Sequence, residues 1–270
     1  MATLLIGYDV ECVDDPDLTR AFVRQARRVH GELGAPCTLF LVGRVVEQRA
    51  DEFAPLLGDP LFDLQQHTYS HVLLKTVCMD DGEKVTLVRG GTLEQIDDEI
   101  GRTNALLKAR LGIECTGLTG PWCYYRGLMD RPDLLEVVHR HGLRFLRTFG
   151  RNEKDFQPVP FEWQPFFYEP QGFPEILECM IHGWQDVHWK MLWGYGNLAG
   201  YGAHLRECLD SLAGSDLVFS YGTHDWSSLR EDPQMSVIRG FIEQARCRGL
   251  RLLTYADYYR ERLAARAAAP

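Results

Sequence analysis

Two carboxylates stand at a spacing that suits a cation site. Asp9 and Glu11 lie two residues apart at the end of an apolar run, so on a strand they would face the same side. Two carboxylates crowded on one face repel each other unless a cation or a shared proton lies between them. The alternative is that both lie beyond the strand in solvent, or that one caps the helix that starts near Asp15.

Two histidines could complete such a site. His67 and His71 are four residues apart, which on a helical turn would place both imidazoles on one face. Two imidazoles and one carboxylate are a common ligand set for a catalytic ion with open positions for water and substrate. The spacing also arises by chance, and it gains weight from its place after a predicted strand. We expect one divalent ion, with zinc as the first expectation and cobalt, manganese or nickel as alternatives.

Further histidines follow other apolar runs. His224 comes just after the run 217–219, a position from which an imidazole can act as a general acid. The alternative is that His224 caps a helix or is simply solvated. His182, Asp186 and His188 form a second polar cluster, for which a second metal is the weaker interpretation.

The elements that must position these residues alternate between strands and helices. Apolar runs predict strands at 3–10, 37–42, 62–66, 116–120, 143–148, 176–181, 216–221 and 250–254. Amphipathic segments predict helices at 17–33, 44–57, 92–111, 132–141, 203–213, 233–248 and 255–267, with 150–175 mainly loop. Thr92 with Gln95 three residues on has capping-box spacing, and Gly112 is a plausible helix end. The alternation predicts an α/β fold with a mainly parallel sheet, whose chemistry lies at the carboxyl ends of its strands.

Composition excludes several partners. The 270 residues include 29 Lys and Arg against 38 Asp and Glu, a formal charge of −9, which argues against nucleic acid and against a basic membrane-binding patch. No apolar run approaches the roughly 20 residues of a membrane helix. Without a secretory signal at the N-terminus, and with no Cys-x-x-Cys pair among eight cysteines, we expect reduced thiols and a cytoplasmic protein. Homo-oligomerisation stays open.

These motifs together resemble the polysaccharide deacetylase family, the NodB-homology amide hydrolases that include carbohydrate esterase family 4. Residues 62–71 end in His-Thr-Tyr-Ser-His, which is similar to the family's His-Ser/Thr-x-x-His metal motif. Residues 35–43 resemble its second strand and 93–112 its Glu-rich helix. The resemblance runs over essentially the whole chain. It implies one catalytic domain over 1–270, a distorted (β/α) barrel of about seven parallel strands, and a divergent intracellular member.

The resemblance also implies roles for the polar residues. Tyr8-Asp9 matches Phe-Asp in the family motif Thr-Phe-Asp-Asp-Gly, so Asp9 would be the general base. Val10 stands where the second Asp, a metal ligand, belongs, and Glu11 is the nearest substitute. His67 and His71 would be the other two metal ligands. His224 matches the family's Leu-x-His motif and would be the general acid.

The third family motif, Arg-x-Pro-Tyr/Phe-Gly, differs in this chain. Residues 119–123 read Thr-Gly-Pro-Trp-Cys, so Thr119 replaces the arginine that orients the base. Arg126 and Arg147 are the candidate substitutes. The backbone N–H of Trp122 is a candidate oxyanion donor, since any non-proline residue can supply one. We expect Trp122, Tyr125 and Trp184 to line the substrate pocket, with packing in the core as the equal alternative.

The implied function is metal-dependent hydrolysis of a carbon–nitrogen amide bond in a small molecule. A soluble N-acetylated amino sugar or its glycoconjugate is the expected substrate. One alternative is a metal-independent hydrolase of a cyclic ureide or imide. Another is a carbohydrate-binding module that has lost catalysis, although Asp9, His224 and both metal-motif histidines are retained. Residues 72–91 would form either a lid over the pocket or a surface hairpin.

Overall fold

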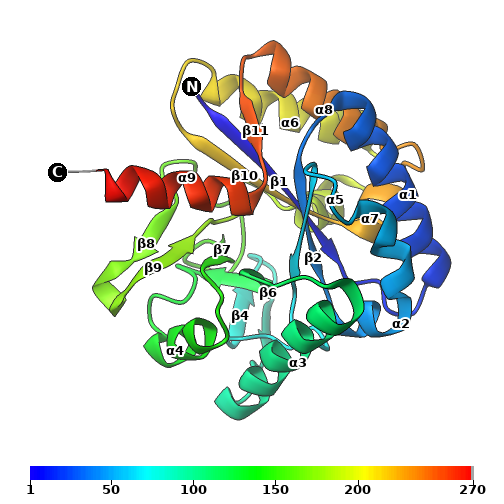
Figure 1. Cartoon of the computed structure of the whole chain (residues 1–270). Coiled ribbons are helices and arrows are strands. Elements are labelled where there is room, and N and C mark those ends of the chain that lie inside the picture. Colours follow the sequence, from blue (N-terminus) through cyan, green and yellow to red (C-terminus); the bar gives the residue numbers. More distant parts are fainter. Residues whose placement is uncertain (269–270) are drawn as a thin grey trace.

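The computed structural model describes residues 1–268 and contains one nine-stranded sheet (Figure 1). Eight of its strands correspond to the predicted apolar runs, whereas β8 lies in the segment 150–175 that was predicted to be mainly loop. Its order is β10-β1-β2-β3-β6-β7-β9-β8, and β11 pairs with β1. Within the described residues every pairing of this sheet is parallel except that of β8 with β9. The strands are β1 (Thr3–Val10), β2 (Cys37–Leu41), β3 (Phe62–Gln66), β6 (Gly117–Tyr125), β7 (Phe145–Arg151), β8 (Phe166–Tyr168), β9 (Phe173–Glu178), β10 (Val218–His224) and β11 (Arg251–Leu253).

The sheet curves into the expected distorted barrel. After β9, the backbone N–H of Ile181 donates to Phe149 O at 2.7 Å and that of His182 donates to Ser220 O at 3.0 Å. This segment therefore bridges β7 and β10, the two sides of the curved sheet. No strand ladder within residues 1–268 completes the closure, so the barrel is held here by single backbone bonds.

Residues 1–268 form nine α-helices, most of which lie around the outside of the sheet (Figure 1). They are α1 (Pro16–Leu33), α2 (Gly43–Phe53), α3 (Leu93–Leu111), α4 (Pro132–Arg140), α5 (Asp186–Trp193), α6 (Leu198–Leu212), α7 (Asp225–Leu229), α8 (Ser236–Cys247) and α9 (Tyr255–Ala267), with 3₁₀ turns at Ala54–Leu56 and Glu169–Gln171. The sequence did not predict α5 or α7, because both are short and neither shows a clear apolar stripe. Across residues 1–268, no helix combines the length and apolarity that a membrane crossing requires.

The ends of α3 confirm the capping prediction. The Thr92 hydroxyl accepts a hydrogen bond from the backbone N–H of Gln95 at 3.2 Å, satisfying a donor that the first turn leaves open. Gly112 ends the helix at φ 71°, a left-handed conformation that costs glycine little. The position of α3 matters for the site, because this helix supports the loop that carries the two metal-motif histidines.

The interior of the barrel holds one apolar layer. Five strands contribute to it, and α9 adds two tyrosines; its members are Leu5, Phe40, Phe145, Leu177, Cys179, Val218, Tyr255 and Tyr258. A larger core fills the space between the sheet and the outer helices. Because both faces of β1 are buried, that strand is apolar almost throughout, as parallel strands usually are.

Residues 72–91 contain a two-stranded antiparallel hairpin of β4 (Val77–Asp80) and β5 (Val85–Val88). The backbone N–H of Cys78 donates to the Asp155 carboxylate at 2.9 Å, which ties the hairpin to the loop after β7. The segment thus contains a hairpin, as one of the two alternatives expected, and a role as a lid stays a prediction.

Candidate active site

The polar residues singled out in the sequence meet at the carboxyl ends of the strands. Asp9 is the next-to-last residue of β1 and pairs in register with His224, the last residue of β10. His67 directly follows β3, which lies on the other side of β1 across β2. Parallel strands bring their carboxyl ends to one edge, which is why residues distant in sequence share one site.

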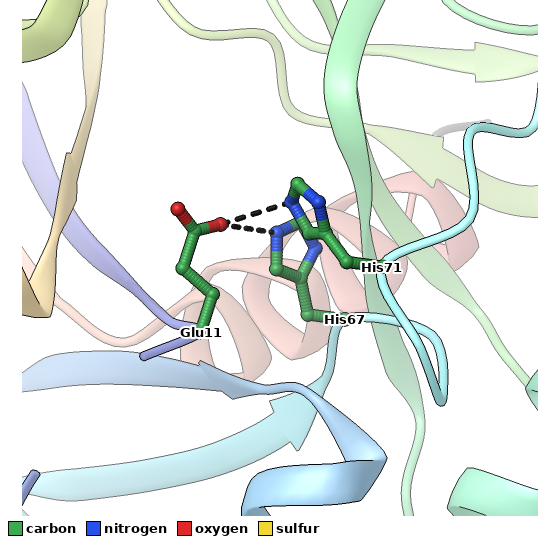
Figure 2. A group of neighbouring side chains, drawn as sticks. All are labelled: Glu11, His67 and His71. Atoms are coloured by element: carbon green, nitrogen blue, oxygen red, sulfur yellow. Dashed lines mark ion pairs between the residues drawn. The ribbon is translucent and has the colours of Figure 1, made fainter. Parts of the chain in front are cut away.

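Glu11, His67 and His71 form a compact group of potential metal ligands. Their ligand atoms all lie within 4.8 Å of one another, and Figure 2 shows both imidazoles turned toward the Glu11 carboxylate. Glu11 Oε2 lies 2.9 Å from His71 Nε2 and 3.5 Å from His67 Nε2. The sequence placed these three residues together, and the structure does so as well.

The donor set fits a divalent ion. Glu11 Oε2 is buried and has no hydrogen-bond partner, a costly state unless a ligand completes it. His67 Nδ1 lies 2.9 Å from Thr119 O, so it carries the proton and leaves Nε2 as an electron-pair donor toward the group. Burial alone raises the pKa of Glu11, but the charge of His224 and the adjacent imidazoles hold the pKa well below its usual range. A carboxylate and two imidazoles are ligands that zinc accepts.

The two histidines do not share a helical turn, and that expectation is corrected. Thr68 and His71 have φ values of 60° and 65°, which interrupt any helix between them. Glu99 of α3 fixes the loop instead, accepting hydrogen bonds from the backbone N–H and the hydroxyl of Ser70, both at 2.6 Å. The imidazoles converge because the loop is bent by these contacts.

Asp9 lies between the ligand group and His224. Its Oδ2 is 3.9 Å from His67 Nε2 and 4.0 Å from His224 Nε2. Its Oδ1 is ion-paired with Arg147 Nη2. One oxygen of the carboxylate is thus held by a cation while the other faces the site.

Arg147 reaches Asp9 from the strand next to Thr119. Thr119 on β6 and Arg147 on β7 are register partners, and Arg147 Nε donates to Thr119 Oγ1 at 3.0 Å. The Arg147 guanidinium is fully buried. Two glycines leave room for it, because a Cβ atom would lie only 2.8 Å from Nη1 if placed on Gly7 and only 2.7 Å from it if placed on Gly222. Of the two candidate substitutes, Arg147 therefore has the required contact.

Arg126 has no such contact. Its guanidinium is exposed and lies 5.1 Å from the Tyr125 ring centroid and 5.7 Å from that of Trp163. It is a surface residue beside an aromatic cluster.

A buried carboxylate orients His224. His224 Nδ1 lies 2.8 Å from Asp186 Oδ1, and Asp186 Oδ2 accepts hydrogen bonds from the Thr223 hydroxyl at 2.7 Å and from the His224 backbone N–H at 3.1 Å. Burial by itself lowers the pKa of His224, but Asp186, followed by Glu11, reverses the effect and raises the pKa to about 10. His224 is therefore protonated near neutral pH, with Nε2 facing Asp9.

The second polar cluster predicted in the sequence does not form a metal site. Asp186 serves His224, whereas His182 Nδ1 accepts a hydrogen bond from the Ser220 backbone N–H at 3.0 Å. His182 Nε2 lies 2.7 Å from Trp163 O, and burial lowers the pKa of His182 to about 4. Both of its ring nitrogens are thus used within the fold. Sequence reasoning missed the role of Asp186, for which spacing alone carried no signal.

The pairing of Asp186 with His224 predicts a pH effect. A general acid must carry its proton, so the rate should fall as pH rises through the raised pKa of His224. Replacing Asp186 with Asn removes the negative charge that raises this pKa. We expect the alkaline limb of kcat/KM to move down by about one to three pH units. An unchanged limb would remove His224 from this role, and Asp133→Asn, in an exposed ion pair with Arg131, is the matched control.

These groups open into a cavity of about 280 Å³. Its lining residues are Asp9, Glu11, His67, His71, Met79, Trp122, Arg151, Gln185, Val187, His188, Met191, His224 and Trp226. Met79 comes from β4, so the hairpin also supplies part of the cavity wall. Trp122 lines the cavity as expected and is 37% exposed.

Tyr125 and Trp184 do not line this cavity, contrary to expectation. The Tyr125 ring packs against Phe149 at a centroid distance of 6.3 Å. Trp184 packs against Phe156 at 5.9 Å and Trp193 at 5.2 Å. Each ring finds aromatic partners away from the site, which was the packing alternative.

Comparisons with known proteins agree with this fold. One solved structure, a putative polysaccharide deacetylase from Mycobacterium smegmatis, is 12% identical with a TM-score of 0.66, over all of this chain and 92% of the other. Puue allantoinase is 14% identical with a TM-score of 0.65, over 96% of this chain and 88% of its own. A carbohydrate esterase family 4 pseudoenzyme from Bacillus anthracis is 11% identical with a TM-score of 0.56, over 95% and 65%.

The sequence itself matches the model of one protein family. A search of curated proteins gives no match. The model of the polysaccharide deacetylase family, in contrast, matches residues 12–146, a span that contains His67, His71 and Thr119. This match supports hydrolysis of amide bonds as the general activity. With half of its length matched, and with a barrel whose strand ends gather these polar groups, the chain belongs to the polysaccharide deacetylase family.

Proposed function

We propose that this protein is a divalent-metal-dependent amide hydrolase that removes an acyl group, in the first place acetyl, from a small N-acylated amino sugar or glycoconjugate. The observation that carries the proposal is one cavity that holds the Glu11, His67 and His71 group beside Asp9 and beside His224, whose ring is oriented by Asp186. The whole chain would act as one catalytic domain. A cytoplasmic location and homo-oligomerisation stay predictions from the sequence.

The residues can divide the chemistry between them. Glu11, His67 and His71 would hold a divalent ion, which when bound would supply Lewis acidity toward the substrate carbonyl and toward water. Asp9 Oδ2 accepts the proton of the attacking water, while Arg147 on the other oxygen keeps the carboxylate oriented. His224 Nε2 donates its proton to the departing nitrogen, and Asp186 holds the ring in place. The Trp122 backbone N–H is the proposed donor to the oxyanion.

The cavity favours a small substrate. About 280 Å³ is close to the lower end of small-molecule sites, so it suits a single sugar unit better than a polymer. Trp122 and Trp226 supply aromatic faces of the kind that stack on sugar rings. We therefore place N-acetylated monosaccharides and their conjugates ahead of polysaccharides.

Metal content gives the direct test. Protein purified without added metal should hold about one divalent ion per chain, and His67→Ala and Glu11→Ala should each lose it, because each removes one of three ligands. Elemental analysis measures the ion, and release of acetate from N-acetyl amino sugars measures activity. The control His139→Ala removes a half-exposed imidazole outside the cavity and should keep the ion.

Two other results would redirect the proposal. Hydrolysis of a cyclic ureide that survives chelation would favour the metal-independent alternative, which the likeness in fold to Puue allantoinase keeps in view. A protein that binds sugars, holds no ion after reconstitution with zinc, cobalt or manganese, and releases no product would be a binding module. Either outcome contradicts the metallohydrolase.

A further inference from the structure

One wall of the catalytic cavity carries a buried arginine that the proposed hydrolysis does not use. Arg151, the last residue of β7, is 1% exposed and lines the cavity. Its Nε donates to the backbone oxygens of Trp122 at 2.8 Å and Cys123 at 3.1 Å, and its Nη1 donates to Asp155 O. A guanidinium out of water is costly unless a charge balances it, and carbonyl oxygens balance it only in part.

No acidic side chain of residues 1–268 forms an ion pair with Arg151. Asp155 meets Arg151 through its backbone oxygen, and its carboxylate accepts the backbone N–H of Cys78 at 2.9 Å instead. Arg147, the other large buried arginine, differs in this respect because it is paired with Asp9. Arg151 thus presents to the cavity a positive charge with which no carboxylate of residues 1–268 forms a direct ion pair.

Neighbouring polar groups on the same wall also have hydrogen-bonding capacity that the fold does not use. His188 Nδ1 is buried and has no hydrogen-bond partner in the described part of the chain. Burial, followed by the charge of Arg151, lowers the pKa of His188 to about 4, so its imidazole is neutral near pH 7. Gln185 Oε1 accepts a hydrogen bond from Gln157 Nε2 at 2.8 Å, which orients the Gln185 amide with its N–H donors available. Gln185 is also the N-cap of α5, where the helix dipole is positive.

We propose that the substrate carries an anionic group, a carboxylate or a phosphate, which Arg151 binds with help from Gln185 and His188. The proposal rests on the proposed function, because it names the substrate class for the same cavity. Since Nε and Nη1 of Arg151 donate to backbone oxygens, Nη2 is the nitrogen left to donate to an oxygen of either anion. The amide would then lie at the group of Glu11 and the two histidines, with the Trp122 ring, 5.5 Å from the Arg151 guanidinium, packed beside the bound molecule.

Matched substrates test the proposal. The wild-type enzyme is assayed for acetate release from N-acetylglucosamine, its 6-phosphate and the corresponding uronic acid. We expect kcat/KM for at least one anionic member to exceed that of the neutral sugar by about tenfold or more, and the preferred member identifies phosphate or carboxylate. Arg151→Met should lower the ratio of anionic to neutral kcat/KM by about 10- to 100-fold, mainly through KM. The ratio is independent of how much enzyme is correctly folded.

Arg126→Met is the matched control. It removes an exposed guanidinium outside the cavity and should leave the ratio unchanged. If Arg151→Met does not fold, Arg151→Lys takes its place, since it keeps the charge but loses the planar guanidinium. The comparison of anionic with neutral substrates in the wild-type enzyme then still tests the proposal. Equal rates for neutral and anionic substrates, together with no dependence of the ratio on Arg151, would overturn the proposal while the hydrolase proposal stands.

A binding measurement separates this proposal from the proposed function. Calorimetry with inorganic phosphate and with succinate, at constant ionic strength and with a chelator present, probes the anion site without a metal ion. Binding should appear in the wild type and in His67→Ala and be lost in Arg151→Met. If no amide is hydrolysed but this binding is found, the hydrolase proposal fails and the anion site stands. If neither anion binds to the wild type, the anion site is refuted.

Discussion

Replacing Asp9 with Asn should lower kcat by about 10²- to 10⁴-fold, the contribution that a positioned general base commonly makes. Asparagine keeps the size of the side chain and one oxygen for Arg147, but it cannot take a proton from water. Asp9 is not among the three grouped ligands, so the variant should retain its ion. Steady-state rates, together with elemental analysis of the same sample, check both expectations.

The pattern of rate and metal content assigns the role. A variant that loses its ion would make Asp9 a ligand, and a rate within tenfold of the wild type would exclude it as the base. Asp17→Asn, an exposed change in the first turn of α1, is the control and should behave as the wild type. His224→Ala should reduce kcat on the same scale and likewise keep the ion, because His224 is the proposed acid on the other side of the site.

Replacing Arg147 with Thr should lower the free energy of unfolding by about 3–5 kcal/mol, since it leaves the buried Asp9 carboxylate without its cation. The activity should fall as well, because Asp9 Oδ1 loses its anchor. Thr119 and Arg147 are register partners, so Thr119→Arg combined with Arg147→Thr moves the guanidinium to the adjacent strand. That position is where the family motif has its arginine.

We expect the exchanged pair to recover part of both losses relative to Arg147→Thr alone. Urea unfolding measures the stability and kcat/KM the activity. Arg144→Thr removes a partly exposed arginine next to β7 whose bonds go only to backbone carbonyls, and it should cost far less. If the exchanged pair is no better than the single change, the two strands are not equivalent supports for the base.

The sequence by itself determined most of the helices and strands and most of the residues that meet at the candidate site. The strand at 62–66 and the helix at 255–267 match their predicted bounds, and Thr92 and Gly112 end α3 as expected. Such features depend on neighbouring residues, through periodic burial, capping and turn chemistry, so a local pattern is enough to reveal them. His67 and His71 were found from their place directly after a predicted strand and from the family motif, although the helical turn that their spacing suggested does not form.

Contacts between distant segments were decided only by the tertiary structure. Asp9 and Arg147 are 138 residues apart, and His224 and Asp186 are 38 apart. Their pairing depends on the register of parallel strands and on where α5 begins, which no local pattern encodes. A local pattern likewise does not show that Tyr125 packs against Phe149 whereas Arg151 lines the cavity. Which side chain faces a site is set by strand order and bulges, since these fix its direction after the chain has folded.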